Sequence, residues 1–403
     1  MSQQDAMMGQ QQKAFWDYTP DRRLAHLPSP PTDDEVRLAL ARNNVKCPLN
    51  EIIVSPPNDG NFRILHRFAF SAYQRFNRSC RGCNFGIYCP PGQGKTFIVK
   101  RFAETIGIPF AFIQSPGLQD CWDLFQQVSK ACEKAGVPVV PTKRDKSDFT
   151  LPPCIIFFDE AHQLRESLQR GSLLNPMEPD DGYMHIKQPG KNGEMLVVNC
   201  KEVCWIGATT DPADLFDAFR TRLSTTIEWV PATEKELPAI VKAGLDAKER
   251  KGEITKSPPL HVCEMICKYQ KVPRSAIHSF GVMVVQQKAM MPSDSWEECC
   301  KLVAHDLAID EWGLTRKQVA ILAALGQRPI SLAGLGNVAK CRAEQVRSME
   351  LPGLQQYTNG GPFVISLTGR GVCITEAGLR ELEKRGLPHK GKKITAEYFE
   401  SKR

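Results

Sequence analysis

The middle of the chain alternates short apolar runs with amphipathic segments. NFGIYC (84–89), PFAFIQ (109–114), CIIFF (154–158) and EVCWIGA (202–208) predict four strands, because each is apolar and bounded by turn residues. TFIVKRFAETIG (96–107) places apolar residues near helical spacing and ends at a glycine, and residues 118–136 predict a second helix. Strands that alternate with helices predict an α/β fold, a mainly parallel sheet with helices on both faces.

The pattern becomes helical from residue 233 onward. Three amphipathic segments follow one another with short gaps and predict a small helical domain. After it, a helix-turn-helix pattern precedes two strand candidates, FVISL (363–367) and GVCIT (371–375), which predicts a winged helix. The expected parts are an irregular N-terminal extension (1–60), an α/β domain (61–232), a helical lid (233–308), a winged helix (309–388) and a basic tail (389–403).

The composition is that of an ordinary globular protein. Of 403 residues, 42% are hydrophobic and 24% are charged, which excludes a disordered or collagen-like chain. No apolar run is long enough to cross a bilayer, and the polar start MSQQDAMMGQQQKAF does not resemble a secretory signal. The 15 cysteines are therefore expected to be reduced thiols of a cytoplasmic protein.

The positive charge is concentrated at the C-terminal end. Residues 311–403 carry 15 Lys and Arg against 8 Asp and Glu, a difference of +7 that equals the net charge of the whole chain. A locally basic module is typical of a protein that binds a polyanion such as nucleic acid, although a solvated surface gives the same count.

One loop has the composition of a phosphate-binding site. Cys89-Pro-Pro-Gly-Gln-Gly-Lys-Thr96 lies between a predicted strand and a predicted helix and departs from G-x-x-x-x-G-K-[ST] only at Cys89. Glycines let backbone N–H groups surround phosphates, and the helix N-terminus adds positive potential. The residues expected to hold ATP are Pro91, Gly92, Gln93, Gly94, Lys95, Thr96 and Phe97, with the Thr96 hydroxyl on Mg²⁺.

Two carboxylates follow the third strand. IIFFDE (155–160) is an apolar run that ends in Asp159 and Glu160, so both carboxylates are expected at the carboxyl edge of the sheet. Asp159 is expected to share the Mg²⁺ ion with Thr96, and Glu160 to polarise the attacking water.

Three further parts of the chain fit a phosphoryl-transfer site. Thr209 or Thr210, after the fourth strand, is placed to sense the γ-phosphate, with Thr210 preferred as the catalytic residue. Arg222 or Arg220 is a candidate arginine finger for a neighbouring subunit, and Arg274 is expected to touch the phosphates of its own subunit.

Taken together, these segments resemble a known family. CPPGQGKT, FFDEAHQL, IGATTDPADL, AFRTRL and VPRSAI look like the ATPase motifs of AAA+ proteins, most of all those of RuvB, the Holliday-junction branch-migration motors. LTRKQVAILAAL, ISLAGLGNVAK and ITEAGLREL look like the RuvB winged helix. The resemblance covers roughly residues 61–385 and implies an AAA+ αβα sandwich with a lid and a winged helix.

The resemblance also implies assembly and substrate. It implies a hexameric ring with ATP at subunit boundaries and duplex or junction DNA as the substrate, in recombination and repair. LLNPMEPDDGYMHIK (173–187) resembles the RuvB segment that leads into a hairpin, so the 173–200 hairpin is the candidate site for a protein adaptor. The candidate DNA contacts are Arg316, Lys317, Arg342, Arg347 and Arg370.

Departures from the RuvB pattern leave other functions open. The wing reads Thr368-Gly-Arg-Gly-Val372 and keeps one arginine where RuvB has two, and residues 1–60 do not resemble the RuvB N-terminus. An ATP-gated DNA-binding loader or target selector, which recruits partners without translocating, is the main alternative. A remodeller of protein substrates is a third possibility, but no aromatic pore loop is evident.

Overall fold

The computed structural model describes residues 47–74, 80–141, 148–178, 180–187, 195–355, 362–367 and 371–397. Within these ranges no helix is long and apolar enough to cross a membrane. Arg370 of the expected wing and residues 188–194 of the expected 173–200 hairpin lie outside the described residues.

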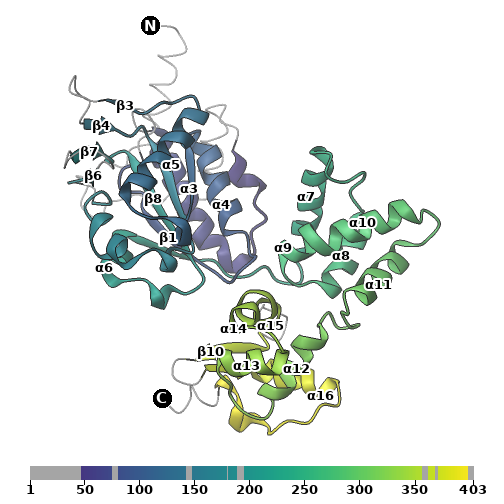
Figure 1. Ribbon diagram of the computed structural model, residues 1–403. Helices are drawn as coiled ribbons and strands as arrows, with labels where there is room; N and C mark the ends of the chain where they lie inside the picture. The colour runs from purple at the N-terminus through teal and green to yellow at the C-terminus, as the bar shows by residue number, and fades with distance from the viewer. Residues whose placement is uncertain are drawn as a thin grey trace, which may run out of the picture. The chain divides into compact units, whose positions relative to one another are not determined.

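A five-stranded parallel sheet forms the centre of the first domain (Figure 1). Its order is β2-β5-β8-β1-β9, with β1 (Phe85–Tyr88), β2 (Phe110–Gln114), β5 (Cys154–Asp159), β8 (Val203–Thr209) and β9 (Thr225–Glu228). The four strands predicted from the sequence, and their parallel arrangement, are confirmed. Strand β9 is not predicted, because its four residues TTIE include one buried apolar side chain and show no clear pattern.

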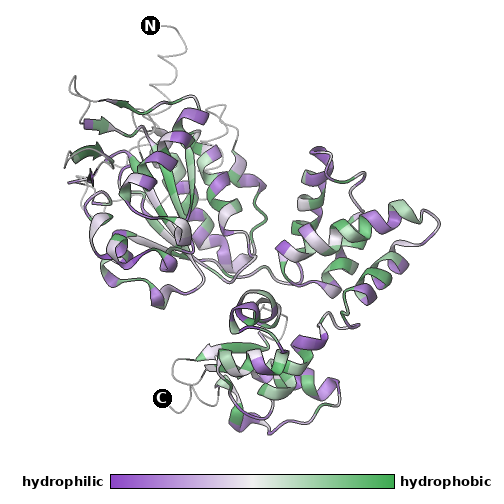
Figure 2. Cartoon of the chain, in the orientation of Figure 1, coloured by the Kyte–Doolittle hydropathy of each residue, from purple (hydrophilic) through white to green (hydrophobic). Residues whose placement is uncertain are grey.

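Both faces of this sheet are covered by helices. The pleat of β5 sends Ile155 and Phe157 into a core with α3 (Asp59–Gln74) and α4 (Lys95–Ile106). It sends Ile156 and Phe158 into the opposite core with α5 (Cys121–Lys134). A strand buried on both faces is continuously apolar, which is why β5 and β8 are recognisable in the sequence (Figure 2).

The domain begins before the expected boundary at residue 60. Leu49 and Ile52 are buried in the same core as α3 and α4, and the Leu49 N–H donates to the Thr105 hydroxyl. The boundary also falls inside α3, which starts at Asp59. The short helical turns of this domain are η2 (Pro48–Glu51), η3 (Pro56–Asn58), η5 (Ser115–Gly117), η6 (Ala161–Gln163), η7 (Leu168–Ser172) and η8 (Pro212–Asp214).

A second sheet has the order β3-β4-β7-β6. The predicted hairpin strands are β6 (Tyr183–Lys187) and β7 (Met195–Asn199), paired antiparallel. The largely polar segment 141–153 contributes β4 (Asp148–Thr150) and the end of β3 (Val140–Pro141). Tertiary contacts produce these strands: β4 pairs with β7, and the Phe149 ring lies 5.5 Å from that of Phe125.

The helical domain has its own apolar core. It contains α7 (Leu237–Arg250), α8 (Leu260–Tyr269), α9 (Pro273–Ser275), η9 (Ala276–Phe280), α10 (Gly281–Met290) and α11 (Trp296–Asp306). Cys263 and Cys267 are buried among the apolar side chains of this core, as expected from their spacing on one helical face.

The C-terminal module combines short helices with an antiparallel strand pair. Its elements are α12 (Arg316–Leu325), α13 (Leu332–Ala339), α14 (Ala343–Gln345), η10 (Val346–Glu350), α15 (Leu351–Gln355), β10 (Val364–Leu367), β11 (Gly371–Ile374), α16 (Glu376–Lys384) and η11 (Lys392–Ile394). Part of the segment expected to be a basic tail (389–403) instead packs against the C-terminal module. Thr395 bridges to Ile374, and Ala396 is fully buried.

Candidate nucleotide site

The phosphate-binding loop connects β1 to α4. Gly92 and Gly94 have φ of +79° and +91°, a left-handed conformation that L side chains rarely adopt. A Cβ on Gly92 would also lie 2.5 Å from a methyl carbon of Val272, so the loop has no room there for any side chain. These two positions explain why the motif keeps both glycines.

Cys89, the departure from the motif, is compatible with this loop. It is not among the described residues with positive φ, so its backbone accepts a side chain. Burial is the main cause that raises the pKa of its thiol to about 12, which keeps the group neutral near pH 7. Its backbone carbonyl accepts a hydrogen bond from Lys95 Nζ at 3.1 Å.

Lys95 and the two carboxylates come together at the carboxyl edge of the sheet. Lys95 is buried, and its Nζ lies 3.5 Å from Glu160 Oε1. Burial and the neighbouring Glu160 charge raise the pKa of Asp159, while Lys95 and Arg274 lower it. Asp159 and Glu160 therefore share one electrostatic environment with the loop lysine, as the sequence predicts.

Glu160 is held in an unusual conformation. Its φ of +50° is left-handed, which is uncommon outside glycine. Its Oε2 accepts hydrogen bonds from the Thr210 N–H at 3.2 Å and from the Thr210 hydroxyl at 3.0 Å. Thr210 thus contacts the general-base candidate directly.

Thr209 has a different environment from Thr210. It is fully buried, and its hydroxyl lies 2.8 Å from His162 Nδ1 and accepts from the Asp211 N–H at 2.9 Å. His162 Nδ1 in turn lies 3.5 Å from Glu160 Oε2. His162 thus connects the Thr209 hydroxyl to the Glu160 carboxylate through polar contacts.

The two candidate finger arginines have separate partners. Both belong to α6 (Asp217–Arg222). Arg220 pairs at 2.6 Å with Asp217 of the same helix, whereas Arg222 pairs at 2.6 Å with Glu178, in the segment that leads into β6. Glu178 is a residue that the sequence analysis missed, since no spacing relates it to Arg222.

Arg274 contacts the loop through its backbone, whereas Phe97 contacts Arg101. The Arg274 N–H donates to the Gly92 carbonyl at 3.3 Å, so the start of α9 is next to the loop. Phe97 is 46% exposed and stacks under the Arg101 guanidinium, 5.0 Å from the ring centroid.

The donor set fits a magnesium ion. Thr96 offers a hydroxyl and Asp159 a carboxylate, and Mg²⁺ prefers such oxygen ligands. No group of three or more His, Cys, Asp or Glu suited to a metal occurs within the described ranges. A site with one or two protein ligands, completed by phosphates and water, agrees with that composition.

The candidate DNA-binding side chains are not gathered into one cluster by any described contact. Arg316, Lys317, Arg342 and Arg347 are all exposed. Arg347 pairs at 2.5 Å with Asp211, which lies just after β8. One of these four side chains therefore already has an acidic partner.

Residues 85–230 match the AAA family, ATPases associated with various cellular activities. The chain is similar in structure to Thermotoga maritima RuvB, a Holliday junction branch migration motor, with a TM-score of 0.59 and 20% identity over 82% of this chain and 95% of that one. The chain thus contains a segment that matches the AAA family, and it has a RuvB-like fold. A single-residue mutant of the same RuvB gives a TM-score of 0.60 at 20% identity, over 83% of this chain and 97% of the mutant. The RuvB-like fold spans the ATPase domain and extends beyond it.

Proposed function

We propose that this protein is a ring-forming ATPase that uses Mg²⁺ and ATP to move duplex DNA, with branch migration of junctions as the reaction. The observation that carries the proposal is the convergence of Lys95, Asp159, Glu160 and Thr210, from the ends of two sheet strands and the loop. An AAA domain and a RuvB-like fold support the same conclusion.

The described side chains have distinct tasks in such a site. Loop N–H groups and Lys95 bind the phosphate oxygens, while Thr96 and Asp159 hold the metal. A bound Mg²⁺ ion would neutralise charge that develops on the transferred phosphoryl group. Glu160 accepts a hydrogen bond from the attacking water and so directs it in line.

Glu160 must first exchange its present partners. Its carboxylate is now engaged by Lys95 and by Thr210. Lys95 turns to phosphate oxygens when they compete for its charge, which frees one carboxylate oxygen for water. Thr210 then keeps the other oxygen in place, so that Glu160 has a single orientation.

We place the nucleotide at a boundary between subunits. Arg222 is 30% exposed, and one carboxylate holds it at the surface. An arginine that serves a neighbour requires a head-to-tail interface, and such an interface closes into a ring when the rotation permits. The hexamer is the ring that the RuvB resemblance implies.

The C-terminal module is the proposed DNA contact, acting as a winged helix. Arg316, Lys317, Arg342, Arg347 and Arg370 would bind phosphates, so binding is expected to weaken steeply with salt. The 173–200 hairpin is the proposed site for a protein adaptor.

The test is ATP hydrolysis by the full chain with four-way junction, linear duplex or single-stranded DNA. Junction or duplex is expected to stimulate turnover, and Lys95→Ala and Glu160→Gln to reduce it by about 100-fold or more, since each removes a group needed in the transition state. Turnover that no DNA changes would contradict a motor, and absence of DNA binding would redirect the search to a protein client.

A second candidate is an ATP-gated DNA-binding assembly. The contacts of Glu160 with Lys95 and Thr210 favour this second function. A carboxylate occupied by other side chains is less able to direct an attacking water, which suits slow hydrolysis. Glu160→Gln separates the two functions: a motor loses movement of DNA, whereas a gated binder keeps or strengthens its ATP-dependent complex.

A further inference from the structure

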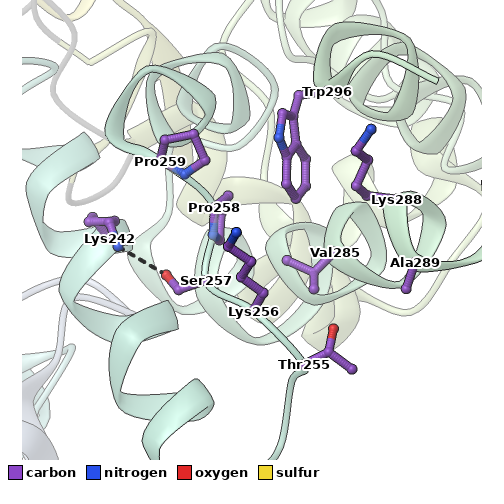
Figure 3. Close-up of a pocket in the computed structure, with 10 residues that line it drawn as sticks. All are labelled: Lys242, Thr255, Lys256, Ser257, Pro258, Pro259, Val285, Lys288, Ala289 and Trp296. Atoms are coloured by element: carbon purple, nitrogen blue, oxygen red, sulfur yellow. Dashed lines mark hydrogen bonds between the residues drawn. The ribbon is translucent and has the colours of Figure 1, made fainter. Parts of the chain in front are cut away.

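The helical domain contains a cavity of about 520 Å³ that the nucleotide site does not use (Figure 3). It lies between α7, the segment 255–259 and the helices α10 and α11. Its volume falls within the range of about 300–1,000 Å³ that is typical of small-molecule sites. None of its lining residues belongs to the phosphate-binding loop.

Three lysines give this cavity a positive charge. Lys242 shares its charge with Asp246 and donates to the Ser257 hydroxyl at 3.2 Å. Lys288 donates to two backbone carbonyls, those of Pro292 and Asp294, and its charge helps to lower the pKa of Glu298 without a direct ion pair among the described contacts. Lys256 is exposed, and its ammonium group lies next to Pro258 (Figure 3). An anion is therefore the complementary ligand.

An aromatic wall lies among these cations. The half-buried Trp296 ring stands between Lys288 on one side and Pro258 with Lys256 on the other (Figure 3). Lys288 Nζ is 5.8 Å from the ring centroid and so occupies one side of the indole. The side toward Pro258 remains available for a planar group, which stacks favourably on tryptophan.

The cavity offers little to a peptide backbone. Pro258 and Pro259 have no N–H group, and the Ser257 N–H already donates to a Glu249 carboxylate oxygen at 3.0 Å. An extended peptide would gain few main-chain hydrogen bonds here. A ligand of this cavity would instead be recognised by the lysine ammonium groups, the face of the Trp296 indole and the aliphatic side chains of Val285 and Ala289.

We propose that this cavity binds a mononucleotide unit, with its base against the Pro258 side of Trp296 and its phosphate near Lys256 and Lys242. The same chemistry is offered by a free nucleoside monophosphate and by the phosphorylated end of a nucleic acid strand. The site does not depend on the proposed motor activity.

The test uses uridine monophosphate, which lacks the β- and γ-phosphates that a phosphate-binding loop holds, in a calorimetric titration of the full chain. Lys256→Glu is expected to weaken its binding at least about tenfold, because it replaces an attraction to phosphate by a repulsion. Lys251→Glu, at an exposed lysine of the same connection outside the cavity, is the matched control and should stay within about twofold. ATP hydrolysis without DNA should not change in either variant.

Competition by short oligothymidylates distinguishes the two sources. Displacement by the 5′-phosphorylated but not the 5′-hydroxyl strand supports a strand end, and displacement by neither supports the free nucleotide. Equal binding by both lysine variants would overturn the proposal. So would loss of uridine monophosphate binding in Lys95→Ala alone, which would place the ligand in the loop, or binding of a polyglutamate peptide in place of the nucleotide. Because Lys95→Ala disables the proposed ATPase and spares this cavity, failures of the two proposals are distinguishable.

Discussion

At the scale of single residues, two adjacent threonines have opposite surroundings. Thr210 donates its hydroxyl to Glu160, while the buried Thr209 hydroxyl contacts His162. Thr209 is the last residue of β8, whereas Thr210 follows the strand. Thr210 is thus the residue placed to orient Glu160, the proposed general base.

Replacing Thr210 with valine tests this role. The variant keeps the shape and loses the hydroxyl bond to Glu160, so kcat is expected to fall about tenfold while KM stays within about twofold. Steady-state ATP hydrolysis measures both. Thr255→Val, at an exposed threonine of the helical domain outside the nucleotide site, is the control. An unchanged kcat in the Thr210 variant would remove this threonine from the mechanism.

At the scale of elements, segments of little regular pattern complete the ATPase domain. Turn η2 adds Leu49 to the core of α3 and α4, and β4 joins the second sheet beside β7. Both are short, and their burial depends on partners far along the chain. The sequence therefore underestimates how far the domain extends.

Leu49→Ala tests whether residues 47–58 belong to this domain. Leu49 is fully buried, so truncation is expected to lower the free energy of unfolding by about 2–5 kcal/mol. Leu260→Ala, at a leucine that is 48% exposed, should cost about 1 kcal/mol or less. Urea unfolding of the full chain gives both values, and equal stability of the two variants would argue that the segment is a separate extension.

At the scale of the whole molecule, the proposed active site requires two subunits. Glu178 holds Arg222 at the surface, away from described contacts with its own phosphate-binding loop. Arg222 is therefore better prepared than Arg220, which pairs within its own helix, to reach a neighbour.

Mixing two inactive variants tests action between subunits. Arg222→Ala keeps Glu160, and Glu160→Gln keeps Arg222, so about a quarter of the interfaces in an equimolar mixed ring regain a complete site. DNA-stimulated hydrolysis should recover in that mixture. It should not recover when Arg222→Ala is mixed with the Arg222→Ala, Glu160→Gln double variant. Failure of both mixtures, with rings formed, would mean that Arg222 does not act across the interface.

The sequence by itself determined four of the five strands of the central sheet, the phosphate-binding loop and the carboxylate pair. These features are local: buried parallel strands are continuously apolar, and the loop requires glycines at fixed positions beside a lysine. The RuvB-like fold follows from the same segments.

Only the tertiary structure decided which groups meet. The pairing of Arg222 with Glu178, the hydrogen bonds from Thr210 to Glu160, and the cavity next to Trp296 join residues from different elements. Sequence periodicity reports which face of an element is buried, but it carries no information on which distant residue packs against that face. Contacts of this kind are set by packing of the whole domain.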